Sequence, residues 1–175
     1  EEEGRALQNL ALVLKNTGHL REAEETLRFA RDLVAKAGNL NRVARCDLNL
    51  SSVLYRRGLW AQAALQAKLA LEHFVNRGLP AAVVSAELAL GRALRAQGAM
   101  PEARELLERA LVAARESGGP RSIVVALEFV ADCDLDAGDV DLGRERYSEA
   151  LLRARELGSE TDLVVECSRG LALAE

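Results

Sequence analysis

Two kinds of polar side chain in this sequence carry chemistry suited to recognition. Asn9 and Asn49 lie forty residues apart, and each amide offers a donor and an acceptor together, so it can hold a peptide main chain without reading its sequence. Arginine, which recurs along the same part of the chain, binds carboxylates through paired hydrogen bonds where geometry permits. The basic residues concerned are Lys15, Arg45, Arg56, Arg92 and Arg95. Both sets require a scaffold that gathers them on one surface.

Catalytic and metal-binding motifs are missing from the sequence. The only two histidines, His19 and His73, lie beside a turn glycine and near a helix end, where surface or capping roles are typical. The three cysteines are far apart and form no CxxC pair, so we expect reduced thiols. No Ser, His and Asp set, paired catalytic carboxylates, HExxH motif or phosphate-binding glycine loop occurs. We therefore predict no enzymatic activity, no catalytic residue, no metal and no cofactor.

Composition favours an all-α fold. Of 175 residues, 49% are hydrophobic but only 3% aromatic, so the core must be built from Leu, Ala and Val, which suits closely packed helices. The formal charge of −4 leaves no excess of positive charge for phosphates, so nucleic acid is not an expected partner. No apolar run approaches the roughly 18 residues that cross a bilayer, and the first residues have no signal-peptide character. We expect a cytoplasmic protein with no membrane partner.

Glycines divide the chain into helices of equal length. They recur every twenty residues, at Gly18, Gly38, Gly58, Gly78, Gly98, Gly118, Gly138 and Gly158. Between them, apolar residues follow the three-and-four spacing of an amphipathic helix, and glycine just past a helix end is a common stop. Start signals follow the glycines: Pro80 and Pro120 suit a first turn, Asn39 and Asp139 suit caps, and Ser159 begins a capping-box-like sequence. Connections of two or three residues make successive helices of about 17 residues antiparallel.

The true period is two helices, or forty residues. Small residues recur at Ala11, Ser51, Gly91 and Ala131, and again at Ala23, Ala63, Ala103 and Gly143. We predict one domain over 1–175, with repeats at about 1–38, 39–78, 79–118 and 119–158 and a partial unit at 159–175. The sequence has no initiating Met and stops inside an apolar pattern, which indicates a piece of a longer protein. Two features depart from the repeat: Asp134 enters a buried column of leucines, which predicts a shifted or looser fourth unit, and Gly170 falls one residue out of step with Gly91.

This pattern resembles the tetratricopeptide repeat (TPR) family. The resemblance rests on Leu followed by a small residue, the turn glycine, a large residue two beyond it, and Ala after five and twelve, over essentially the whole chain. The large residues are Leu20, Trp60, Met100 and Val140. The period exceeds the usual 34 residues by about six, as in the extended repeats of kinesin light chains, cell-polarity scaffolds and bacterial regulators. The resemblance implies a right-handed superhelical solenoid of antiparallel helix pairs with a concave face.

The resemblance also assigns a binding surface. In this family the first helix of each pair lines the concave groove, which here would be basic in three units and acidic in the fourth, with apolar residues between. The residues we predict to contact a partner are Asn9, Lys15, Arg45, Asn49, Tyr55, Arg56, Arg92 and Arg95. Related repeats use asparagine to hold peptide main chain. The acidic end of the groove would be formed by Glu128, Asp132 and Asp136.

Three functions fit this sequence, in the order in which we favour them. The first is a protein-interaction module that binds a peptide or partner protein, with acidic residues in the ligand, inside a larger bacterial regulatory or signalling protein such as a transcription regulator. The second is a sensor of a ligand or signalling peptide that controls an attached effector domain. The third is a self-association array, a homo-oligomer formed through exposed terminal helices. An enzyme on a helical scaffold would require a pocket with several close carboxylates.

Overall fold

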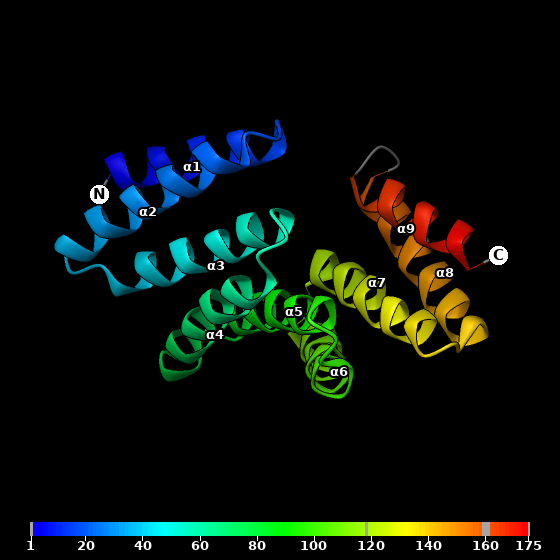
Figure 1. Ribbon diagram of the computed structural model, residues 1–175. Helices are drawn as coiled ribbons and strands as arrows, with labels where there is room; N and C mark the ends of the chain where they lie inside the picture. The colour runs from blue at the N-terminus through cyan, green and yellow to red at the C-terminus, as the bar shows by residue number, and fades with distance from the viewer. Residues whose placement is uncertain (1, 118, 159–161, 175) are drawn as a thin grey trace.

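The computed structural model describes residues 2–117, 119–158 and 162–174, and throughout these ranges every regular element is a helix. The predicted all-α solenoid is therefore confirmed (Figure 1). The helices are α1 (Glu2–Asn16), α2 (Leu20–Lys36), α3 (Leu40–Arg56), α4 (Trp60–Asn76), α5 (Pro80–Ala96), α6 (Met100–Ser117), α7 (Pro120–Asp136), α8 (Val140–Leu157) and α9 (Asp162–Leu173). None of these helices is both long and apolar enough to span a membrane.

The turn glycines end the helices as predicted. Gly38 has a φ of +73°, a left-handed conformation that costs glycine little. The Gly38 N–H donates to the Ala35 carbonyl at 2.9 Å and the Asn39 N–H donates to the Val34 carbonyl at 3.0 Å, so the last turn of α2 is satisfied by main-chain groups. Gly18, Gly58, Gly78, Gly98 and Gly138 have a φ between +61° and +87°, whereas Gly158 has a φ of +145°. Gly118 lies outside the described residues.

Helix starts also follow the sequence signals. The Asn39 side chain accepts a hydrogen bond from the Arg42 N–H at 3.1 Å, and the Asp139 carboxylate accepts one from the Leu142 N–H at 3.4 Å. Pro80 and Pro120 are the first residues of α5 and α7, where a missing N–H is harmless. The capping sequence predicted at Ser159 lies outside the described residues.

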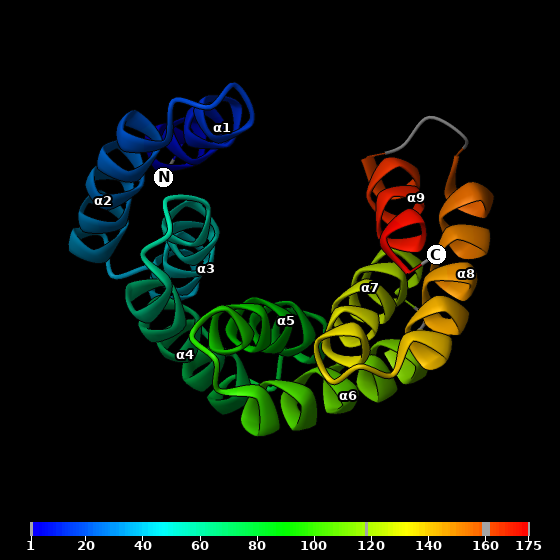
Figure 2. The ribbon, with the colours of Figure 1, turned by 45° about the vertical axis from the view of Figure 1, so that its right-hand side comes forward.

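The helix pairs form an open arc whose inner layer consists of the odd-numbered helices (Figure 2). Each helix packs on its neighbours in sequence, and each odd-numbered helix also contacts the next odd-numbered one. Within the described ranges, no two even-numbered helices contact each other. The inner layer is therefore more compact than the outer layer, and the stack curves towards it, as expected of a solenoid. The two ends of the chain lie at opposite ends of the arc.

Small residues at the predicted positions allow the helices to pack closely. Ala23, Ala63, Ala103, Ala30, Ala70, Ala110 and Ala150 are all fully buried. A Cβ added at Gly91 would lie 2.6 Å from the Leu107 side chain, so even one methyl group exceeds the space between α5 and α6. The core around these contacts consists mainly of aliphatic side chains.

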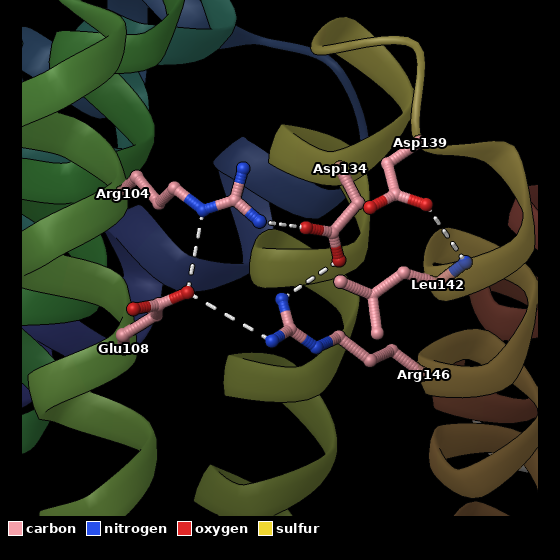
Figure 3. Close-up of polar contacts among 6 residues, drawn as sticks. All are labelled: Arg104, Glu108, Asp134, Asp139, Leu142 and Arg146. Atoms are coloured by element: carbon pink, nitrogen blue, oxygen red, sulfur yellow. Dashed lines mark hydrogen bonds and ion pairs between the residues drawn. The ribbon is translucent and has the colours of Figure 1, made fainter.

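Asp134 does not shift the fourth unit, contrary to our expectation. Its side chain is 0% exposed, in the same column as the buried Leu54. Arg104 reaches it from α6 and Arg146 from α8, the latter at 2.7 Å between Nη1 and Oδ2 (Figure 3). Glu108 accepts from Arg104 Nε at 3.3 Å and holds the pair of arginines in place. A buried carboxylate is tolerated here because two cations from different repeats satisfy it.

Gly170 lies one residue out of step with Gly91, as the sequence indicates, because it occupies a different column of the repeat. Gly170 is buried, at the repeat position that carries the buried Leu50 two units of forty residues before the buried Val130, which in turn lies forty residues before Gly170. A Cβ at Gly170 would collide with the Tyr147 ring of α8. Glycine therefore replaces a large residue at this position because its partner on the preceding helix is unusually large.

Candidate binding groove

A groove of about 800 Å³ is lined mainly by residues of the inner helices in the first half of the chain. Helices α1, α3 and α5 provide most of its walls, and the end of α4 closes one side. Its lining residues are Arg5, Gln8, Asn9, Leu12, Asn39, Asn41, Arg42, Arg45, Leu48, Asn49, Phe74, Ala81, Ala82 and Ser85. The predicted groove therefore exists, and Asn9, Arg45 and Asn49 of the predicted binding residues line it.

A second cavity of about 300 Å³ continues along the inner face towards α7. It is lined by Lys15, Leu48, Asn49, Ser52, Ser85, Leu88, Ala89, Arg92, Arg121, Ser122, Val125 and Phe129. Leu48, Asn49 and Ser85 line both cavities, so the two form one continuous surface. Of the predicted binding residues, Lys15 and Arg92 line this second cavity together with Asn49.

The two asparagines present their amides to the groove. Asn9 and Asn49 are exposed, and none of the side-chain hydrogen bonds found among the described residues involves either amide. Gln8, between them, donates to Cys46 Sγ at 2.8 Å and fixes α1 against α3. The amides of Asn9 and Asn49 can therefore pair with a ligand main chain without breaking an internal bond.

Arg92 is held at the centre of the inner face by two aromatic rings. Its guanidinium carbon lies 4.0 Å from the centroid of the Tyr55 ring on α3 and 5.4 Å from that of the Phe129 ring on α7. Such stacking fixes a planar cation that would otherwise rotate freely. Burial lowers the pKa of Arg92, although Tyr55 and the carboxylate of Glu128 favour its charged form. Tyr55 thus contributes to the surface by positioning Arg92.

Arg95 is neutralised inside the protein. Its Nη1 lies 2.5 Å from Asp132 Oδ2 and its Nε lies 2.5 Å from Asp136 Oδ2, both on α7. The Tyr147 hydroxyl donates to the other oxygen of Asp132. The structure therefore separates Arg95 from the other basic residues that we grouped with it, because two carboxylates of this chain already pair with its charge.

Lys15 and Arg56 lie beside the second cavity as a connected pair. Arg56 Nη1 donates to the main-chain carbonyl of Lys15 at 2.5 Å, which joins α3 to the end of α1. Burial, together with the positive charges of Arg56 and Arg92, lowers the pKa of the Lys15 ammonium. These three cations are therefore close enough to repel one another.

Sequence reasoning missed the residues that helix ends and turns contribute to the groove. Asn41, Arg42, Phe74, Arg121 and Ser122 line the cavities, but the repeat pattern assigns the inner face only to mid-helix positions of odd-numbered helices. Their contribution depends on how far each helix end projects past its neighbour. No signal in the sequence reports that projection.

The acidic end of the inner face carries a carboxyl group with an altered titration. Burial, followed by the negative charges of Asp132 and Glu166, raises the pKa of Glu128 to about 7, against the opposing effect of Arg169 and Arg92. The charge of this end of the surface therefore changes near neutral pH. Across the residues described, no cluster of three or more His, Cys, Asp or Glu side chains could hold a metal ion.

The Glu128 carboxyl should make stability depend on pH. The folded protein holds this proton more tightly than the unfolded chain, whose Glu titrates near 4.5. Its contribution to stability is therefore present below that pH and is lost as pH rises through 7. We expect Glu128→Gln to be more stable than the wild type by about 2 kcal/mol at pH 8.5, a rise of several degrees in Tm, and to show a much smaller gain at pH 4.5.

The measurement is thermal unfolding followed by circular dichroism at both pH values. Glu105→Gln, at an exposed position of the outer helix α6, is the matched control and should change Tm by little at either pH. An equal gain at pH 4.5 and 8.5 would show that Glu128 is not held protonated by its surroundings.

Comparison with solved structures identifies the class of fold. A putative kinesin light chain with nearly identical TPR-like repeats from Podosopora anserina matches with a TM-score of 0.74 and 20% identity, over 97% of this chain and 84% of that one. A Rap protein complexed with Competence and Sporulation Factor matches with a TM-score of 0.90 and 17% identity, over 98% of this chain and 48% of that one. Aspartyl phosphate phosphatase F from Bacillus subtilis matches with a TM-score of 0.82 and 14% identity, over 99% and 45%.

These likenesses show that the chain has the fold of TPR-like repeat proteins, as the sequence pattern predicted. It spans about half the length of the Rap protein and of the phosphatase. No protein-family profile and no curated protein sequence matches it. At identities of 14–20% these similarities show the fold alone.

Proposed function

We propose that this chain is a protein-interaction module that binds a peptide, or an extended segment of a partner protein, along its inner face. The observation that carries this proposal is Asn49. Its exposed amide stands where the two cavities meet, and Asn9 presents the same group one repeat earlier. Two amides on one continuous surface, one repeat apart, can hold successive parts of an extended main chain.

The charges of the surface favour an acidic ligand segment at the centre of the groove. Arg45 and Arg42 line the larger cavity, while Lys15 and Arg92 line the smaller one. Apolar contacts come from Leu48 and the other aliphatic side chains between them. A ligand with a carboxylate near its middle would place that group beside these cations.

Removal of either amide should weaken peptide binding. A probe peptide would be selected from a displayed random library on the wild-type chain, and its Kd measured by calorimetry. Asn9→Ala and Asn49→Ala should each raise Kd roughly tenfold, the loss of about one or two hydrogen bonds. Asn76→Ala, at the exposed end of the outer helix α4, is the matched control. A selected peptide that binds all four proteins equally would place the binding surface outside the groove.

The second candidate function is a sensor of a signalling peptide that controls an attached effector. It is favoured by the similarity to the Rap protein, which was solved in complex with Competence and Sporulation Factor. This reading includes our prediction of a bacterial regulatory or signalling protein and of a cytoplasmic location. A sensor should change curvature on binding, so small-angle scattering with and without the selected peptide separates it from a rigid docking module.

Self-association is the third candidate. On α1, Leu10 and Val13 are 49% and 58% exposed, whereas Leu50 and Val53, at the same repeat positions on α3, are buried. On α9, Val165 and Leu173 are also exposed. These faces are apolar enough to join copies end to end. Light scattering that reports a monomer at high protein concentration would exclude this function.

A further inference from the structure

Three cations on the inner face have no carboxylate partner within the described part of the chain. Lys15 on α1, Arg56 on α3 and Arg92 on α5 take part in none of the ion pairs found there. Two other arginines near the inner face are paired with acids, Arg95 with two aspartates and Arg121 with Asp162. Glu128 on α7 is near enough to favour the charged form of Arg92 but forms no ion pair with it.

The Arg92 side chain contains an unsatisfied donor. Its Nε is buried and has no hydrogen-bond partner, while its guanidinium carbon lies over the rings of Tyr55 and Phe129. A buried N–H without an acceptor costs free energy, and a charged donor costs more than a neutral one. Arg92 lines the cavity of about 300 Å³, so an anion that enters there would meet a cation whose position the two rings already restrict.

The neighbouring groups complete a set of anion ligands. The cavity of about 300 Å³ is lined by Lys15, Asn49 and Ser52 as well as Arg92, which together offer an ammonium, an amide and a hydroxyl. Arg56 adds positive charge at the edge, since its guanidinium is anchored on the Lys15 carbonyl at 2.5 Å. An anion placed among these groups would relieve the repulsion between the cations and would accept their hydrogen bonds.

We infer that the cavity between Lys15, Asn49 and Arg92 is an anion subsite, which takes the phosphoryl or carboxylate group of a bound peptide side chain. The identity of the ligand as a peptide rests on the proposed function, whereas the anion chemistry rests on the cavity alone. The subsite deepens that proposal because it names a place in the groove where a negatively charged group of the ligand would bind. Arg95 is not part of it, since Asp132 and Asp136 already pair with its guanidinium.

The test uses inorganic phosphate as the probe on the whole chain, with ionic strength held constant by sodium chloride so that general screening does not change. The arginine Nε–Hε resonances are followed by NMR. We expect a saturable shift of the Arg92 resonance, with half-saturation on the order of 1 mM. Lys15→Gln and, separately, Arg56→Gln should weaken phosphate binding, the former about tenfold or more. Arg45→Gln removes a charge from the larger cavity only and should leave the titration unchanged.

Acetate in place of phosphate distinguishes the two anion sources. Phosphate binding at least tenfold tighter than acetate assigns a phosphoryl group to the ligand, and equal or tighter acetate binding assigns a carboxylate. The inference is overturned if the Arg92 resonance shows no saturable shift with either anion, if Lys15→Gln titrates like the wild type, or if all arginine resonances shift alike.

The outcome is independent of the groove proposal. Asn9 lines only the larger cavity, so Asn9→Ala reports on peptide binding and should leave phosphate binding unchanged. A positive phosphate titration with no loss of peptide affinity in Asn9→Ala would retain the subsite and remove the proposed main-chain contact. A loss of peptide affinity in Asn9→Ala together with no saturable phosphate titration would support the main-chain contact and contradict the subsite.

Discussion

Replacing Asp134 by alanine is expected to lower the free energy of unfolding by about 3 kcal/mol. The carboxylate is fully buried between α6 and α8 and bonds to Arg104 and Arg146 (Figure 3). Alanine would leave a cavity and remove the acceptor from two arginines. We expect the lower end of the range for a broken buried ion pair because the Arg104 and Arg146 side chains are 34% and 22% exposed and can partly return to solvent.

The variant Asp134→Leu distinguishes the contribution of the ion pairs to stability from the contribution of side-chain packing. Leucine is the residue that the other units carry in this column, at positions such as Leu54. Burial raises the pKa of Asp134 although both arginines lower it, so desolvation outweighs their attraction. A leucine that fills the space should therefore cost far less than alanine, about 1 kcal/mol or less.

Chemical denaturation followed by circular dichroism measures these changes. The matched control is Asp141→Ala, which removes a carboxylate with 97% exposure from a surface pair with Arg144 and should change stability by less than about 0.5 kcal/mol. If Asp134→Ala cost no more than this control, the buried pair would contribute nothing to holding α6, α7 and α8 together.

Replacing Gly170 by leucine is expected to release α9 from the end of the solenoid. The equivalent positions on earlier helices carry Leu50 and Val130, so the repeat accepts a large residue in this column. At Gly170 the space is filled by the Tyr147 ring, with which even a Cβ would collide. Overpacking of this kind costs about 3 kcal/mol, more than a terminal helix with one neighbouring pair can absorb.

Hydrogen exchange on the α9 amides reports the release as a loss of protection. Tyr147→Leu combined with Gly170→Leu should restore protection, because leucine on both helices recreates the pairing of Leu50 with the buried Leu27. The single variant Tyr147→Leu completes the double-mutant cycle and accounts for the lost hydrogen bond to Asp132. Unchanged protection in the single variant Gly170→Leu would contradict the expectation that a side chain at this position collides with Tyr147. The control is Ser168→Leu, on the exposed side of α9, which adds the same hydrophobic surface without that collision.

Much of the fold could be predicted because its signals are local. A glycine every twenty residues, an apolar stripe of helical period and a proline or cap at each start specify helix ends within a few residues. Such short connections leave antiparallel packing as the only outcome. The identity of the residues on the inner face follows from the same periodicity, which is why Asn9, Asn49 and Arg92 were found without coordinates.

The sequence alone therefore determined the helices, their pairing and the face on which candidate binding residues lie. Only the tertiary structure decided which charges remain available, because those pairings join residues thirty or more positions apart, such as Arg95 with Asp132 and Arg104 with Asp134. These distances depend on how tightly the inner helices stack and how far each side chain reaches between repeats. A periodic sequence pattern gives no information about either of these features. Arg95 and Arg92 therefore look alike in the sequence, although Arg95 is ion-paired in the folded protein and Arg92 is not.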